Sequence, residues 1–106
     1  MEKLQDIFTK NNFNLTKKTS KAVEFENKAT GEVIYLAPNK EITIVLNPKT
    51  VEQKAILRSD GKLRSTGYTL FPKEQNKGVN PIQYGYSFKF KTEEELDSFL
   101  GSFNRI

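Results

Sequence analysis

The chain has 106 residues, of which 36% are hydrophobic and 28% charged, with a net charge of +4, and this composition fits one globular domain. It contains no cysteine and no histidine, which excludes disulfides and thiolate chemistry and removes the commonest general base and zinc ligand. No apolar run approaches the roughly 18 residues of a membrane span, and residues 1–10 lack the apolar stretch of a signal peptide. We therefore expect a single cytoplasmic domain over residues 1–106, with no membrane partner.

The first predicted element is a short amphipathic helix near the N-terminus. Leu4, Ile7 and Phe8 recur at helical spacing, and the two asparagines at 11–12 end the pattern because asparagine favours turns. Short β runs then follow at residues 23–26, 33–37 and 41–46. Tight turns separate these runs, and such short connections predict three antiparallel strands in sequence order.

The second half of the chain is predicted to begin with a hairpin. Runs at 55–58 and 62–71 flank Ser59-Asp60-Gly61, a three-residue loop in which the glycine can adopt a positive φ. The polar stretch from Pro72 to Pro81 has no apolar periodicity, which predicts a loop. In residues 82–90, apolar and aromatic residues alternate strictly with small or polar ones, which predicts a half-buried strand.

The C-terminal segment carries the strongest local signal, for a second amphipathic helix. Thr92 followed by Glu95 matches a capping box, in which each side chain accepts a hydrogen bond from the other residue's backbone N–H. The apolar residues that follow recur at helical spacing: Leu96, Phe99, Leu100 and Phe103.

Together these elements predict an α+β domain. We expect a mostly antiparallel sheet of about five to six strands, in two or three hairpins, flanked by an N-terminal and a C-terminal amphipathic helix. Both helices should cover one face of the sheet, and the other face should meet water. Runs of strands, rather than alternating strands and helices, argue against a parallel doubly wound fold.

The basic charge is concentrated in the second half of the chain. Residues 54–91 hold eight basic and two acidic side chains, a net charge of +6, whereas the residues before and after them carry +1 and −3. In the predicted hairpin, Arg58 faces Lys62, and the same outer face continues with Arg64 and Tyr68. Two lysines of the following loop complete the set of candidate binding residues: Arg58, Lys62, Arg64, Tyr68, Lys73 and Lys77.

This basic, tyrosine-bearing face favours nucleic-acid binding, because lysine and arginine neutralise phosphates and tyrosine stacks on bases. The alternative is a protein-interaction module, an inhibitor or accessory subunit that docks an acidic partner through the same charge. Lysines on an exposed strand can also simply keep a sheet edge soluble. A continuous basic surface would favour nucleic acid, whereas an apolar centre with a charged rim would favour a protein partner.

Two further features are interpreted as structural rather than functional. Tyr84 and Tyr86 share a face with Phe88 and Phe90, so we assign these tyrosines to the core and its rim. The loop at 72–81 offers polar side chains to a phosphate or a partner, but a plain connector is the favoured interpretation.

No motif in the sequence predicts catalysis. Glycine-rich phosphate-binding motifs are absent, and Glu52-Gln53-Lys54 supplies only the E-x-K half of a metal-dependent nuclease site. The three aspartates, at positions 6, 60 and 97, fall in a predicted helix, turn and helix, so the other half of such a site is missing. We therefore predict a non-enzymatic binding module without a cofactor or metal.

Overall fold

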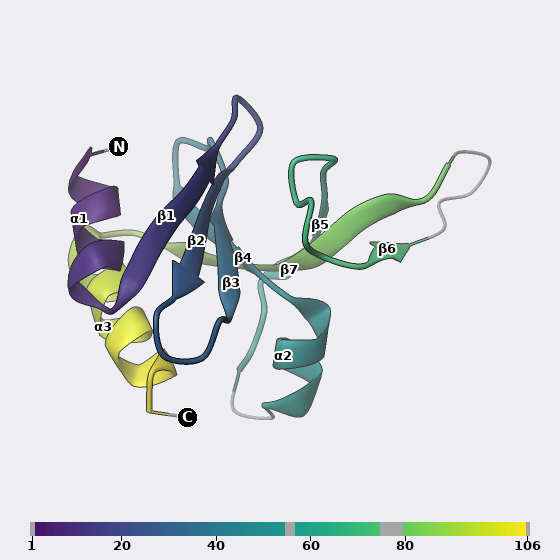
Figure 1. Ribbon diagram of the computed structural model, residues 1–106. Coiled ribbons are helices and arrows are strands. Elements are labelled where there is room, and N and C mark those ends of the chain that lie inside the picture. Colours follow the sequence, from purple (N-terminus) through teal and green to yellow (C-terminus); the bar gives the residue numbers. More distant parts are fainter. Residues whose placement is uncertain (1, 55–56, 75–79, 106) are drawn as a thin grey trace.

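The computed structural model describes residues 2–54, 57–74 and 80–105, and these form one antiparallel sheet with three helices (Figure 1). The sheet has seven strands in the order β1-β2-β3-β4-β7-β5, with β6 paired to the start of β7. In chain order the elements are α1 (Glu2–Lys10), β1 (Phe13–Lys18), β2 (Val23–Asn27), β3 (Val33–Leu36), β4 (Ile42–Leu46), α2 (Pro48–Gln53), β5 (Gly61–Arg64), β6 (Lys73–Glu74), β7 (Ile82–Phe90) and α3 (Glu93–Phe103). None of the described helices is long and apolar enough to cross a lipid bilayer.

The predicted α+β architecture is confirmed, with a helix at each end of the chain. α1 and α3 pack together at one end of the sheet (Figure 1). The capping box that starts α3 is present: Thr92 Oγ1 accepts a hydrogen bond from Glu95 N–H at 3.1 Å, and Glu95 Oε1 accepts one from Thr92 N–H at 3.3 Å. The local sequence signal therefore places the start of this helix correctly.

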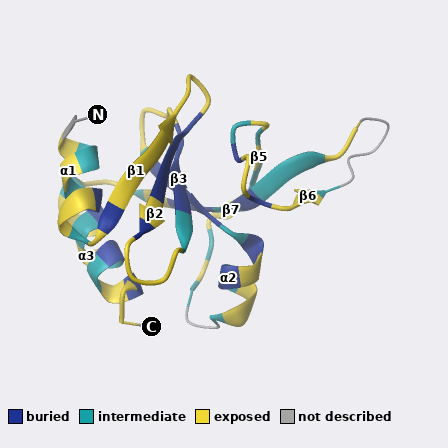
Figure 2. Ribbon diagram, viewed as in Figure 1, coloured by how far each residue is buried: buried dark blue, intermediate teal, exposed yellow. Residues whose placement is uncertain are grey.

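The main hydrophobic core lies between one face of the sheet and the two terminal helices. Phe8 of α1 stacks on Phe25 of β2, with ring centroids 4.0 Å apart, and meets Phe13 of β1 edge-on at 5.7 Å. All three side chains are fully buried. Figure 2 shows buried residues along the central strands, whereas the edge strand β1 is largely exposed. Burial of such aromatic side chains is the main driving force for folding.

The opposite face of the sheet is not left to water, contrary to the expectation from sequence. Residues 65–72, between β5 and β6, fold back over it and bury Tyr68 and Phe71 against Tyr35 of β3. The Tyr35 hydroxyl donates to Glu24 Oε1 at 2.6 Å and accepts from the Leu70 N–H at 3.0 Å. Burial, and then the Glu24 hydrogen bond, raise the pKa of Tyr35, which keeps the hydroxyl protonated and able to donate.

Three elements were not predicted from the sequence: β1, α2 and the two-residue β6, which lies within the predicted loop at 72–81. The strand β1 pairs with β2 at the sheet edge, but its alternation is broken by a register shift between Leu15 and Lys17. The short helix α2 follows β4, and its signal is present in the sequence: the Asn47 side chain accepts a hydrogen bond from the Lys49 N–H, and Pro48 occupies the first turn.

The predicted hairpin between residues 55–58 and 62–71 is wrong in its described part. β5 pairs with β7 instead, so that Lys62 lies opposite Tyr86 and Arg64 opposite Tyr84. The predicted three-residue loop Ser59-Asp60-Gly61 is also hydrogen-bonded to β7, because the Asp60 N–H donates to the Ser87 carbonyl at 2.8 Å. Residues 57–60 form no strand, and residues 55–56 lie outside the described residues.

A polar contact joins the two terminal helices. Asp97 of α3 accepts a hydrogen bond from the Asn11 side chain at 2.8 Å and pairs with Lys10 Nζ at 2.7 Å. The Asn11 hydrogen bond, followed by that of Lys10, lowers the pKa of the Asp97 carboxyl below its ordinary value. A carboxyl whose pKa is lower in the folded state than in the unfolded state stabilises the protein. This stabilisation is fully present when the pH is above the unfolded-state pKa, and it is lost as the pH falls through the folded-state pKa.

Replacing Asn11 with alanine is therefore expected to raise the pKa of Asp97 towards its ordinary value. Carboxyl-carbon NMR titration measures that pKa directly in both proteins. The wild type should be the more stable protein near neutral pH, and its advantage should shrink as the pH falls through the lowered pKa of Asp97. Asn14→Ala, on the exposed edge strand, is the control, and an equal titration shift in that variant would contradict the assigned contact.

Candidate binding site on the arm

The candidate site lies on the part of the sheet farthest from α1 and α3 (Figure 1). We call this part the arm and define it as β5, β6 and residues 82–86 of β7. Directly paired residues on antiparallel strands project from the same face of a sheet. Lys62, Arg64 and Glu74 all pair with even-numbered positions of β7, so these side chains share one surface. This surface, the arm face, consists of Lys62, Arg64, Glu74, Ile82, Tyr84 and Tyr86.

Glu74 binds both cations of the arm face. Its Oε1 lies 2.6 Å from Lys62 Nζ, and its Oε2 lies 2.9 Å from both Nε and Nη2 of Arg64. The Lys62 and Arg64 contacts lower the pKa of Glu74, and the Glu74 hydrogen bond raises the pKa of Lys62. This contact could not be predicted from the sequence, because Glu74 lies within a predicted loop and twelve residues from Lys62.

Two tyrosines complete the arm face. The rings of Tyr84 and Tyr86 meet edge-on with centroids 6.2 Å apart, and both are partly exposed. Lys62 Nζ lies 5.1 Å from the Tyr84 ring centroid, within the range of a cation–π interaction. Tyr86 also packs against the main core, as expected, whereas Tyr84 lies farther out along the arm.

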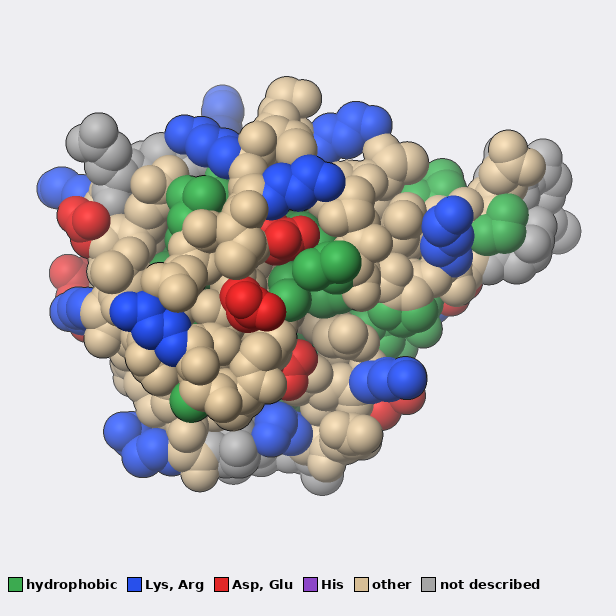
Figure 3. Space-filling view, viewed as in Figure 1, with side chains coloured by type: hydrophobic (Ala, Val, Ile, Leu, Met, Phe, Trp, Pro, Cys, Tyr) green, Lys and Arg blue, Asp and Glu red, His purple; other side chains and the backbone are tan. Residues whose placement is uncertain are grey.

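Of the six residues predicted for binding, the structure brings only Lys62 and Arg64 together among those it describes. Lys73 pairs with Gln83, an odd-numbered position of β7, and therefore projects from the opposite face. Arg58 is exposed but precedes the strand. Lys77 lies outside the described residues. Figure 3 shows Lys and Arg side chains spread around the outline, with Asp and Glu between them, so this view shows no continuous basic surface.

Tyr68 requires a correction, because it is not on an outer sheet face. Its side chain is only 3% exposed and packs against Tyr35 and Phe71, with ring centroids 5.2 and 6.1 Å away. The chain leaves the strand after Arg64 and turns at Ser65, whose carbonyl accepts from the Tyr68 N–H. This turn carries Tyr68 into the second core, where no base could stack on it.

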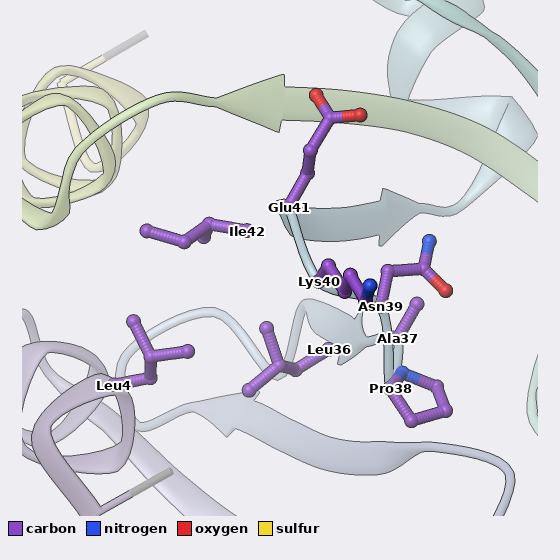
Figure 4. Close-up of a pocket in the computed structure, with 8 residues that line it drawn as sticks. All are labelled: Leu4, Leu36, Ala37, Pro38, Asn39, Lys40, Glu41 and Ile42. Carbon is purple, nitrogen blue, oxygen red and sulfur yellow. The ribbon is translucent and has the colours of Figure 1, made fainter.

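A separate pocket of about 260 Å³ opens beside the N-terminal helix (Figure 4). Leu4, Leu36 and Ile42 point towards one another at its floor, and the turn at 37–41 forms its rim. Among the described residues that line it, the charged side chains are those of Lys40 and Glu41. Across the described residues there is also no group of three or more metal-ligating side chains. Neither the charged side chains of this pocket nor the described metal-ligating residues form a recognisable set of catalytic groups.

The chain matches no family model, no curated protein and no solved structure.

Proposed function

We propose that this protein is a non-enzymatic module that binds single-stranded nucleic acid through the arm face. The observation that carries the proposal is the placement of the partly exposed Tyr84 ring beside the cations Lys62 and Arg64. Stacking on an aromatic ring combined with neutralisation of the neighbouring phosphate is the usual basis of sequence-tolerant single-strand binding. An exposed sheet surface suits this mode, because unpaired bases can lie flat against it.

The composition agrees with sequence-tolerant binding. Residues 54–91 carry the net charge of +6, but the whole chain has only three arginines, at 58, 64 and 105. Since arginine bound to guanine is the commonest specific contact in duplex DNA, we infer backbone and stacking contacts instead of base-edge recognition. Affinity for an oligonucleotide should accordingly be modest and should fall as the salt concentration rises.

Fluorescence anisotropy of labelled dT15, U15 and a matched duplex tests the proposal. At about 50 mM salt we expect single strands to bind more tightly than the duplex. Tyr84→Ala should weaken dT15 binding about tenfold, because stacking contributes roughly 1–3 kcal/mol per base, whereas Tyr84→Phe should change it less than about twofold. Lys62→Gln should also weaken binding, with Lys40→Gln as the charge-matched control away from the arm.

The proposal fails if the wild type binds none of these oligonucleotides, or if Lys62→Gln and Lys40→Gln behave alike. One observation favours a protein partner instead: Ile82, Tyr84 and Tyr86 share the arm face with side chains of mixed charge, Lys62, Arg64 and Glu74. An acidic protein that binds the wild type but not Tyr84→Ala, in a preparation free of nucleic acid, would support that second function.

A further inference from the structure

The contacts of Glu74 resemble those of a bound anion. Three donors converge on its carboxylate: Lys62 Nζ on one oxygen, and Arg64 Nε and Nη2 on the other. Carboxylate and phosphate oxygens accept hydrogen bonds from arginine and lysine in similar geometry. Any phosphate that used these two cations would therefore meet the space and the charge of Glu74.

We propose that Glu74 is a built-in competitor, a carboxylate that occupies the phosphate position of the arm face and that nucleic acid must displace. This inference rests on the proposed single-strand binding. It assigns to Glu74 the regulation of affinity, and it explains how, in a segment with a net charge of +6, Lys62 and Arg64 remain paired with a carboxylate while no ligand is bound.

The structure favours displacement of Glu74 over a fixed structural role. The Glu74 side chain is 26% exposed, and those of Lys62 and Arg64 are 33% and 41% exposed, so all three remain in contact with water. Exposed ion pairs of this kind contribute little to stability. Moreover, β6 is only two residues long, and neither of its residues belongs to a buried cluster. Moving Glu74 therefore leaves both cores intact.

Displacement would also open the stacking surface. Lys62 Nζ lies over the Tyr84 ring, 5.1 Å from its centroid, and is bound by Glu74 Oε1 at 2.6 Å. A phosphate that draws Lys62 away from Glu74 changes the position of its ammonium group relative to the ring. The phosphate and base contacts of one nucleotide are thereby coupled, because both depend on where Lys62 lies.

The test compares Glu74→Gln with Glu52→Gln. Each variant removes one negative charge near Tyr84, but Glu52 belongs to α2 and acts on Tyr84 only through its electrostatic field. Glu74→Gln should raise the affinity for dT15 about tenfold at about 50 mM salt. It should also steepen the dependence of log affinity on log salt by roughly 0.7 for each newly contacted phosphate. Glu52→Gln should change the affinity less than about twofold, and equal thermal midpoints confirm that both variants are folded.

A second probe separates this inference from the proposed function. Inorganic phosphate, followed through the Arg64 Nε–H NMR signal, should bind Glu74→Gln more tightly than the wild type. If the wild type binds dT15 and the two glutamine variants are indistinguishable, the competitor role of Glu74 is overturned and the proposed function stands. If neither the wild type nor Glu74→Gln binds dT15, the proposed function fails. If Glu74→Gln binds a hexaglutamate peptide but not dT15, the competitor role and the proposed function are both overturned. Lys62 and Arg64 would then be assigned to the binding of an acidic protein.

Discussion

Gly85→Ala is expected to destabilise the protein by about 3 kcal/mol, because the sheet leaves no room for a methyl group at this position. Gly85 lies in the middle of β7 and is buried. A Cβ atom there would lie 2.6 Å from both the Leu46 carbonyl oxygen and Val45 Cγ1, and 2.9 Å from the Phe71 ring. The nearest obstacle is the backbone of β4, which cannot move without distorting the ladder between β4 and β7.

Gly101→Ala is the matched control, because it adds the same methyl group where there is space. The nearest atom to its Cβ would be Asn11 Oδ1 at 3.6 Å, an ordinary contact. Gly101 lies within α3, where alanine is favoured over glycine by roughly 0.5–1 kcal/mol, so this variant should be slightly more stable than the wild type. Urea unfolding followed by far-ultraviolet circular dichroism measures both changes. Equal midpoints for the two variants would contradict the close approach of β4, β7 and Phe71.

The parts of the fold that could be predicted are those specified by neighbouring residues. The cap at Thr92 depends on local hydrogen bonding and the strand at 82–90 on a two-residue sequence period, and both the cap and the strand are present in the structure. Burial does not follow that period, because Gly85 and Ser87 on the predicted polar face are buried. The partner of β5 was predicted wrongly, because strand pairing depends on distant residues. A turn-forming Ser-Asp-Gly sequence favours a local hairpin, but the pairing with β7 places Leu63 opposite Gly85 and next to the second core.

The same reasoning explains which site residues were found. Lys62 and Arg64 were identified from the basic charge of their segment and from a hairpin register that is wrong, but any register leaves residues two positions apart on one face of a strand. Tyr68 was misplaced because the prediction extended the strand past Arg64, whereas the chain turns at Ser65. Glu74 could not be found from sequence, because its role follows from the pairing of two-residue β6 with the beginning of β7.

Tyr35→Phe is expected to destabilise the protein by about 2 kcal/mol, although it removes only one oxygen atom. Tyr35 is fully buried, and its hydroxyl joins the sheet to the segment that covers it, donating to Glu24 and accepting from the Leu70 N–H. Without it, Thr16 Oγ1 at 2.7 Å is the one side-chain donor to the buried Glu24 carboxylate that remains among the described residues, and the Leu70 N–H loses the Tyr35 oxygen. Most of the lost stability comes from leaving the buried Glu24 carboxylate with one hydrogen-bond donor fewer.

Tyr68→Phe is the control for this change, since the Tyr68 ring is equally part of the second core but its hydroxyl makes no hydrogen bond to any described residue. We expect its effect to stay below about 0.5 kcal/mol in the same unfolding experiment. Hydrogen exchange should locate the Tyr35→Phe effect in residues 65–72, with protection of β2 and β3 falling less, because the lost contact is the one that holds this segment against the sheet. A uniform loss of protection would mean that the hydroxyl stabilises the sheet itself, and equal effects of the two substitutions would show that ring packing alone holds the segment in place.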